Sequence, residues 1–308
     1  MPECGRGQSN CRGSSFNKKR KKKKRKLINI GTWNVRTLTS IGKLHLLLQE
    51  LTECNMNITG LCETRWSGEG HFSSGERTII HSGKEKGGGS GVAIVLDKTH
   101  AGCMKSYNPV SDRILTVKLN TKPVALNIIQ VYAPTSASTQ EEAEQFYSDL
   151  QAIKDKMPKR EVCIIMGDFN AKVGEGLEHE SGIGPFGLGE RNERGEMLAC
   201  FCQANGMTIT NTCFKQHPRR RYTWIQPGDR ARNLIDYILI TNEWKTTVLN
   251  SKSRPGADCE TDHILVAAKI CLKAYKIVKP KQYARFDTDK LKDLKIRNQF
   301  QIEIKKQI

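Results

Sequence analysis

Five short polar segments of this 308-residue chain flank apolar runs that are typical of β-strands. These segments are Gly31–Asn34, Leu61–Thr64, Val131–Pro134, Met166–Asn170, and Asp236 together with Asp262–His263. Catalytic groups collect at such positions because a strand fixes the backbone while its end opens into a cleft. One such segment alone is weak evidence for a catalytic site, so the chemistry has to be inferred from the five segments together.

The Asp168 and Asn170 pair carries the sharpest single signal. In an extended chain the two side chains would point the same way, which places a carboxylate that can hold a water beside an amide that can donate to a phosphoryl oxygen. The alternative interpretation is an Asx turn, because Asp and Asn favour such bends. Glu63 ends the apolar run Ile58–Cys62. By itself it would be read as an ordinary exposed carboxylate.

Asp236 lies inside the strongly apolar run Leu234–Leu239. A buried carboxylate is costly unless it is paired, so this residue needs a partner. His263 is the natural one, since a carboxylate on one ring nitrogen fixes the tautomer and favours the imidazolium. The alternative is a hydrogen bond with a purely structural role.

The elements that must position these groups are mostly strands. Runs rich in β-branched residues predict strands at Leu27–Trp33, Ile58–Cys62, Arg77–His81, Gly91–Leu96, Ile114–Leu119, Val124–Tyr132, Glu161–Met166, Tyr222–Ile225, Leu234–Ile240 and Ile264–Ile270. Helical spacing of apolar residues predicts helices at Ile41–Cys54 and Gln140–Ile153, and a third helix is expected at Asn192–Ala204. Many strands with few helices favour two packed sheets with helices outside.

The net charge of +18 is concentrated at the two ends of the chain. Residues 1–27 carry 11 basic and 1 acidic side chains, residues 279–308 carry 9 and 4, and the remaining body has a net charge of only +3. We therefore predict a disordered basic arm at 1–26, one domain at 27–278, and a charged linker with a helical tail at 279–308. The nine consecutive basic residues Lys18–Lys26 are typical of a nuclear-localisation or nucleic-acid-binding segment, so we expect a nuclear protein.

Other classes of protein fit the sequence poorly. The longest apolar runs are far shorter than the ~20 residues that a membrane-spanning helix needs, and no apolar segment follows the basic N-terminus as in a signal peptide. The 11 cysteines include no Cys-x-x-Cys pair, which argues against a disulfide framework and a zinc site. We expect an intracellular protein without membrane association.

In their order along the chain, the polar residues resemble the endonuclease/exonuclease/phosphatase superfamily, over about Leu27 to Leu272. That family has an α+β fold, the four-layered αββα sandwich of DNase I-like proteins. Gly31–Thr37, Glu63–Trp66, Tyr222–Trp224 and Ile235–Ile238 more closely resemble the endonuclease domain of non-LTR retrotransposons of the RTE (BovB) type. The family often has Ser where Thr261 stands, a minor departure because both offer a hydroxyl. A host protein related to these elements is similar in length and layout, and since no polymerase follows here we expect an excised or domesticated endonuclease.

The resemblance assigns a role to each polar residue. Glu63 and Asn34 would bind Mg²⁺, or alternatively Mn²⁺, and Asp262 would support the metal or the water. Asp168 would orient the attacking water or accept its proton, and Asn170 would hold the phosphate. The groups that would donate to the transition state are His263, oriented by Asp236, and Tyr132. The expected products are a 3′ hydroxyl and a 5′ phosphate.

DNA is the partner that the resemblance implies, with chromatin as a second candidate. In the related endonucleases the segment between Thr223 and Asp236 forms a hairpin that probes the groove, and arginine suits phosphates and narrow minor grooves. The residues expected to contact DNA are Arg219, Arg220, Arg221, Thr223, Trp224, Arg230 and Arg232. The alternative is a solvated basic loop.

The sequence therefore predicts a Mg²⁺-dependent DNA endonuclease. An abasic-site nuclease or a phosphatase of the same fold stays open because a fold does not fix a substrate. A domesticated, non-catalytic nuclear or chromatin-binding protein is the alternative from a different class. The oligomeric state is left open.

Overall fold

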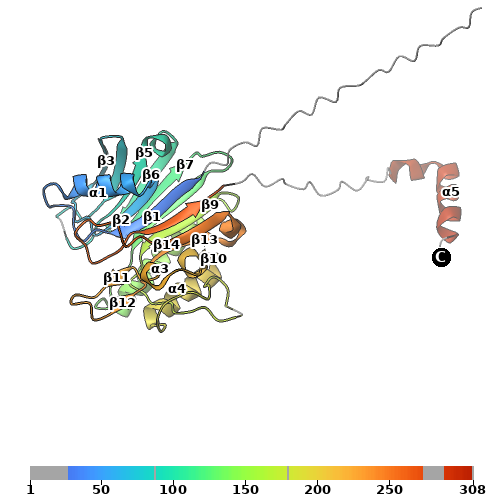
Figure 1. Ribbon diagram of the computed structural model, residues 1–308. Coiled ribbons are helices and arrows are strands. Elements are labelled where there is room, and N and C mark those ends of the chain that lie inside the picture. The colour runs from blue at the N-terminus through green and yellow to red at the C-terminus, as the bar shows by residue number, and fades with distance from the viewer. Residues whose placement is uncertain (1–26, 87, 179, 273–287, 307–308) are drawn as a thin grey trace, which may run out of the picture. The chain divides into compact units, whose positions relative to one another are not determined.

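The computed structural model describes residues 27–86, 88–178, 180–272 and 288–306 (Figure 1). The predicted basic arm at 1–26 and the predicted boundary at 278/279 lie outside these residues. Residues 288–306 form η4 (Thr288–Lys292) and α5 (Leu294–Lys305), in a unit separate from the main body. α5 lies within the segment where the sequence predicts a helical tail. Within its own unit its apolar side chains, such as Phe300 and Ile302, are exposed.

Two β-sheets form the centre of the main body. The seven-stranded sheet has the order β14-β15-β1-β2-β5-β4-β3, with bounds Val248–Ser253, Val266–Ile270, Ile28–Asn34, Ile58–Cys62, Val92–Asp97, Arg77–Ser82 and Glu69–Ser74. The six-stranded sheet has the order β10-β13-β9-β8-β7-β6, with bounds Met207–Ile209, Asp236–Thr241, Val162–Asp168, Leu126–Tyr132, Ile114–Leu119 and Met104–Ser111. A separate two-stranded hairpin pairs β11 (Trp224–Ile225) with β12 (Arg232–Asn233).

The three longer helices of the main body, α1, α3 and α4, lie on the outer faces of the two sheets. α1 (Lys43–Glu53) buries Leu47 and Leu51 against the seven-stranded sheet. α3 (Gln140–Asp155) and α4 (Glu193–Ala204) cover the six-stranded sheet with Phe146, Leu150 and Leu198. The short helical elements are α2 (Lys98–Ala101), η1 (Thr210–Thr212), η2 (Pro218–Arg220) and η3 (Asn242–Thr247).

The inner faces of the two sheets meet in a continuous apolar core. Ile30, Ile58 and Ile94 of one sheet belong to the same buried cluster as Ile128 and Ile164 of the other. Because each sheet is apolar on both faces, its strands read as near-continuous apolar runs, which made them visible in the sequence. The predicted four-layered αββα sandwich is thereby confirmed.

Parallel pairing brings the polar ends of four strands to one edge of the sandwich. β1 and β2 run parallel with Asn34 opposite Cys62, and β8 and β9 run parallel with Tyr132 opposite Asp168. β13 is antiparallel to β9 and begins where β9 ends, with Asp236 opposite Asp168. Asp236 therefore starts its strand, which corrects the expectation that it lies inside one.

Five strands were not predicted: β3, β6, β14 and the short strands β10 and β12, which have three and two residues. β3 and β6 are edge strands with mostly exposed or half-exposed residues, so they lack the buried alternation that marks a strand in a sequence. β14 is also an edge strand. Its sequence, VLNSKS, is polar, and its hydrogen-bond partner is β15.

Gly167 precedes Asp168 in β9, and its backbone approaches the neighbouring strand closely at this edge of the sandwich. It has φ +155°, and a Cβ added there would lie 1.9 Å from the carbonyl oxygen of Val131 on β8. We expect Gly167→Ala to lower the free energy of unfolding by about 3 kcal/mol, because overpacking adds to backbone strain. Thermal and urea unfolding would measure it. Gly256→Ala is the control, since no atom lies within 4 Å of that Cβ. Equal stability of the two variants would contradict this prediction.

Candidate active site

The side-chain amide of Asn34 joins two carboxylates at the catalytic edge. Asn34 ends β1, and its Nδ2 donates to Glu63 Oε1 at 2.9 Å and to Asp168 Oδ2 at 3.0 Å. Its Oδ1 accepts from the backbone N–H of Arg36 at 3.0 Å, which fixes the orientation of the amide. The amide oxygen therefore faces the backbone, and in this geometry Asn34 positions Glu63 and Asp168 instead of offering an oxygen to a metal ion.

Glu63 directly follows β2 and has a left-handed backbone, with φ +54°. Its Oε1 also accepts from the hydroxyl of Tyr132 at 3.0 Å, and its Oε2 lies 3.3 Å from the guanidinium of Arg65. Burial and the nearby Glu63 raise the pKa of the Tyr132 phenol, which keeps this hydroxyl a neutral donor. Arg36, Arg65 and Asn170 share the left-handed conformation. Strained backbone of this kind clusters at functional sites.

Asp168 also belongs to a buried group of ionisable side chains, together with Asp236 and His263. His263 Nδ1 and Asp236 Oδ2 are 3.0 Å apart, and His263 Nε2 lies 3.9 Å from Asp168 Oδ2. The predicted Asp236 and His263 pair is present. Burial lowers the pKa of His263, but Asp236, Asp168 and Asp262 outweigh it and raise that pKa to about 9. Burial first, and then Asp236, raise the pKa of Asp168 to about 7.

The backbone around Asn170 combines features of both sequence interpretations. β9 ends at Asp168, and the N–H of Asn170 donates to Asp168 Oδ1 at 2.9 Å, which is the Asx-turn geometry. The amide of Asn170 donates to the carbonyl of Ala133 at 2.9 Å and still lines the cleft. The turn therefore presents both side chains to the cleft without an extended chain.

All these groups line or lie directly behind one cleft of about 350 Å³. Its lining residues are Arg36, Glu63, Tyr132, Thr135, Ser136, Asp168, Asn170, Lys172, Asn192, Trp224, Asn233, Ile235, Asp262 and His263. The sequence did not single out Arg36, Thr135, Ser136, Lys172, Asn192, Asn233 or Ile235. Arg36 and Lys172 each stand two residues after a predicted site residue, and that spacing was the only available signal.

The carboxylate of Asp262 is paired with two neighbouring side chains at the mouth of the cleft. The guanidinium of Arg36 lies 3.5 Å from Asp262 Oδ2, and the indole N–H of Trp224 donates to the same oxygen at 3.2 Å. Asp262 thus links the end of β1 to the β11–β12 hairpin. With two donors on one oxygen, it is better placed to hold Arg36 and Trp224 than to bind a metal ion directly.

The residues expected to contact DNA separate into different environments. Arg219, Arg220, Arg230 and Arg232 are exposed, and Trp224 lines the cleft. Arg232 lies over the ring of Tyr222, with 4.9 Å to the centroid, and pairs with Asp229 at 2.7 Å. Arg221 is half-buried and bonds to the carbonyl of Gly187 and to Glu175.

Thr223 is fully buried, so the structure places it where it cannot touch DNA. Its hydroxyl accepts from the backbone N–H groups of Ile235 and Asp236, both at 3.1 Å. The sequence did place the hairpin between Thr223 and Asp236 correctly. The burial of Thr223 was not predictable from its residue type, because threonines are mostly exposed.

Two positions in the site could hold a cation. Asp168, Asp236 and His263 bring one ligand atom each within 4.8 Å of one another. However, His263 shares Nδ1 with Asp236, and its raised pKa favours an imidazolium, which has no lone pair to offer. Glu63 fits a hard cation better, since its carboxylate borders the cleft beside Asp168 and Mg²⁺ prefers one or two carboxylates with waters.

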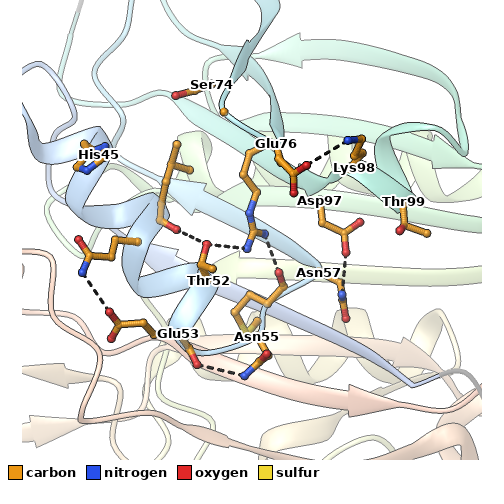
Figure 2. Close-up of a pocket in the computed structure, with 15 residues that line it drawn as sticks. His45, Thr52, Glu53, Asn55, Asn57, Ser74, Glu76, Asp97, Lys98 and Thr99 are labelled. Carbon is orange, nitrogen blue, oxygen red and sulfur yellow. Dashed lines mark hydrogen bonds and ion pairs between the residues drawn. The ribbon is translucent and has the colours of Figure 1, made fainter.

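A larger pocket, of about 980 Å³, lies at the opposite end of β2 and β5 (Figure 2). Its polar side chains are paired with one another: Arg77 donates to Thr52 and to the carbonyl of Met56, Asn57 donates to Asp97 at 2.7 Å, and Lys98 pairs with Glu76. None of the predicted site residues lines it. Its paired groups make it a structural feature despite its size.

The sequence profile of the Endonuclease/Exonuclease/phosphatase family matches residues 31–265. Craniofacial development protein 2 from Bos taurus is 43% identical over 245 residues, which are 79% of this chain and 41% of that protein. The protein of the same name from Tragulus javanicus is 42% identical, with 79% and 42% covered. The chain thus spans less than half the length of these relatives, so the expected similarity in length is wrong.

Solved structures share the fold at low sequence identity. The endonuclease domain of TRAS1, a telomere-specific non-LTR retrotransposon, has a TM-score of 0.59 at 15% identity, and the match covers 80% of this chain and all of that one. The 3′ phosphatase NExo from Neisseria, bound to a product DNA hairpin, has a TM-score of 0.59 at 17% identity with the same coverage. An AP endonuclease from Leishmania major has a TM-score of 0.61 at 12% identity, covering 80% and 88%.

We expect Thr223→Val to act on stability and not on DNA contact. Two buried N–H groups would lose their acceptor, which should cost about 2 kcal/mol in the free energy of unfolding. Thr223→Ser keeps the hydroxyl and is the matched control. Urea unfolding measures the loss, and DNA binding by the folded variant should equal that of the unaltered chain. A Val variant with unchanged stability and weakened DNA binding would return Thr223 to the DNA-contacting set.

Proposed function

The chain belongs to the endonuclease/exonuclease/phosphatase family, and from that premise we propose that it is a Mg²⁺-dependent DNA endonuclease derived from a retrotransposon. One observation carries the proposal: Glu63, Asp168 and the Asp236–His263 pair converge on one cleft, with Asn34 holding two of the carboxylates. These are the groups that phosphodiester hydrolysis requires. In the reaction, water adds across the P–O3′ bond and leaves a 3′ hydroxyl and a 5′ phosphate.

Glu63 is the residue that would hold the metal ion. When bound there, Mg²⁺ supplies positive charge to a nonbridging phosphate oxygen and to the leaving oxygen. Asn34 and Tyr132 fix Oε1 of Glu63 through hydrogen bonds of 2.9 and 3.0 Å. Tyr132 thereby acts as a positioning residue for Glu63, in addition to the donor role that the family resemblance implies. Mn²⁺ has the same preference for oxygen ligands and is the alternative cofactor.

Asp168 accepts the proton of the attacking water. Burial and the neighbouring Asp236 raise its pKa to about 7, so its carboxylate is a competent base near neutral pH. The N–H of Asn170 and the amide of Asn34 each bond to a different oxygen of Asp168, which fixes its plane. Asp168 lines the cleft, so its carboxylate can also orient the water.

His263 donates to the negative charge that develops on the phosphoryl group. Asp236 fixes the ring through Nδ1, which directs Nε2 toward Asp168 and the cleft. Arg36 and Lys172 add positive charge to the cleft lining, and the amide of Asn170 adds a donor. Fixed donors in a water-poor site stabilise such charge effectively because they need no reorganisation.

DNA is the substrate that we propose, on the strength of the basic ends of the chain and of the named neighbours. One neighbour was solved with a DNA hairpin, and another is the endonuclease domain of a retrotransposon. AP endonucleases and a 3′ phosphatase share the fold, so abasic-site cleavage and phosphatase activity are the catalytic alternatives. We also propose nuclear localisation, from Lys18–Lys26, and chromatin as a further partner.

The alternative from a different class is a non-catalytic DNA-binding or chromatin-binding protein. The name of the curated relatives describes development and not an enzyme activity. The complete hydrogen-bonded set around Asn34 and His263 argues for catalysis, since loss of one member would be the first sign of decay. Plasmid nicking in Mg²⁺ against EDTA separates the two proposals.

We expect Asp168→Asn to reduce nicking of supercoiled plasmid by about 10²–10⁴-fold, the range for loss of a general base. Asn keeps the size of the side chain, so the fold should survive. Gel-resolved nicking in Mg²⁺, with circular dichroism as the control for folding, measures the effect. Nicking by this variant at the original rate would remove Asp168 from the mechanism.

Glu63→Gln should reduce nicking by weakening the binding of Mg²⁺. The amide is a weaker ligand for a hard cation, so the Mg²⁺ concentration for half-maximal nicking should rise, and excess Mg²⁺ should restore part of the rate. A titration from micromolar to millimolar Mg²⁺ measures this shift, with Glu76→Gln, an exposed carboxylate in the pocket at the opposite end of β5, as the control. An unshifted titration would count against Glu63 as the metal ligand.

Asp236→Asn, His263→Ala and the double variant test whether the pair acts as one catalytic unit. Each single change should reduce nicking by about 10²–10³-fold. The double variant should be little worse than either single one, because groups that act as one unit are not additive. A structural pair would instead lower the melting temperature and leave the folded variants active. Retained nicking by folded His263→Ala would refute the assignment.

A further inference from the structure

A second cluster of positive charge lies on the outer face of β14 and β15, away from the cleft. Lys252 is paired with Ala267 and Lys269 with Asn250, while Ser251, Ser253 and Ala268 point to the interior and are buried. Alternate residues of a strand share a face, so Lys252, Lys269 and the following Arg254 stand on the same outer face. We name these three residues, together with Arg220 of η2, the basic patch.

The basic patch is not neutralised by carboxylates in the described part of the chain. No salt bridge within 4 Å is formed by any of its four members there. Its three strand residues border a hollow of about 280 Å³ whose lining contains no acidic side chain. The Nε of Arg254 is buried and without a hydrogen-bond partner. Burial, and then Arg220, Arg254 and Lys269, lower the pKa of Lys252, as expected for crowded like charges.

The basic patch is continuous with the cleft. η2 packs against β14, and just before it the amide of Gln216 donates to Asn250 Oδ1 of β14 at 2.6 Å. From Arg220 the chain runs directly into β11, whose Trp224 lines the cleft. Lys252 pairs with Ala267 of β15, and Ala267 lies four residues beyond His263. Lys269 lies six residues beyond His263. At ~3.3 Å per residue of an extended chain, the two lysines are therefore roughly 13–20 Å from His263.

We infer that the basic patch binds the phosphate backbone of duplex DNA on one side of the scissile bond. The inference rests on the proposed endonuclease function and identifies the surface that holds the substrate beyond the cleft. A duplex advances ~3.4 Å per base pair along each strand, so the patch meets phosphates about four to six base pairs from the reaction. Cations without acidic partners repel one another, and a bound polyanion relieves this repulsion. Binding also releases the counterions condensed on the DNA, which adds to the free energy of binding.

Duplex DNA is favoured over RNA and over an acidic protein by this continuity. A ligand on the patch that passes Arg220 arrives at the hairpin that borders the catalytic carboxylates. A patch that only protects an edge strand from pairing with other chains would also carry lysines, but it would have no effect on DNA affinity. The experiment below includes the RNA outcome and the edge-protection outcome.

The test uses the full chain with the triple variant Arg220→Gln, Lys252→Gln and Lys269→Gln. Arg254 is left in place because its buried Nε ties it to the fold. The matched control is Lys156→Gln, Lys159→Gln and Arg160→Gln, which removes three exposed charges from the loop before β9, at the other end of that strand from Asp168. Binding is measured in EDTA, over a range of salt concentrations, to a labelled 40-base-pair duplex, to a hairpin whose 4-base-pair stem is too short to reach from the cleft to the patch, and to single-stranded RNA.

The triple variant should bind the 40-base-pair duplex at least about tenfold more weakly, and its log–log salt slope should fall by about 2.7, or 0.9 for each lost phosphate contact. Binding to the short hairpin should change much less, and the control should resemble the unaltered chain. Unchanged affinity and slope for the long duplex would overturn the inference, as would an equal loss in the control. A larger loss for single-stranded RNA than for duplex DNA would also overturn it.

The same lysine changes separate this inference from the proposed function. Plasmid nicking at saturating DNA should be unchanged in the double variant Lys252→Gln and Lys269→Gln, because neither lysine lines the cleft or belongs to the residues first expected to contact DNA. If the unaltered chain never nicks DNA but the triple variant still loses long-duplex binding, the endonuclease proposal fails and the DNA-binding surface stands. If nicking is normal and long-duplex binding is unaffected by the triple change, only the surface fails.

Discussion

The amide of Asn34 is the interaction on which the site depends. It lies at the end of β1 in one sheet and donates to Glu63 in the same sheet and to Asp168 in the other. A neutral donor with two hydrogens can bond at once to the buried carboxylate of Asp168 and the half-buried carboxylate of Glu63. The amide thereby fixes the spacing of the two sheets at the point where their strand ends open into the cleft.

The second constraint is the balance of buried charge. Asp168, Asp236 and His263 are all nearly inaccessible to solvent, and two carboxylates this close would not both ionise without a counter-charge. His263 supplies that charge, and its raised pKa records the stabilisation. Breaking such a group by removing one partner costs more than the group contributes, because the others remain buried. Thr223 supports the same group through the backbone, since its hydroxyl accepts a hydrogen bond from the N–H of Asp236.

Charge is distributed over the main body in a way that suits a polyanionic ligand. The cleft gathers carboxylates, with Arg36 and Lys172 at its lining, whereas the outer face of β14 and β15 carries cations without acidic partners. The main body is near-neutral as a whole because one of its surfaces is rich in carboxylates and the other is rich in cations. Arg220 belongs to the cationic surface, and the chain that follows it enters β11, whose Trp224 lines the cleft.

The sequence determined the fold and most of the site. Strands buried on both faces, such as Ile58–Cys62 and Ile114–Leu119, were predicted with their observed bounds because β-branched residues and flanking turns mark them. The order of polar residues identified Glu63, Asp168 and His263 because each follows or precedes such a strand. The pairing of Asp236 with His263 was predictable from the cost of a buried carboxylate.

Only the tertiary structure decided the rest. The edge strands β3 and β6 lack a buried face and so lack a pattern. Thr223 and Arg221 are turned inward and Arg36 toward the cleft, and residue type does not encode these directions. Lys252 and Lys269 became neighbours only through the register of β14 on β15, since contacts between distant segments depend on strand pairing and not on spacing along the chain.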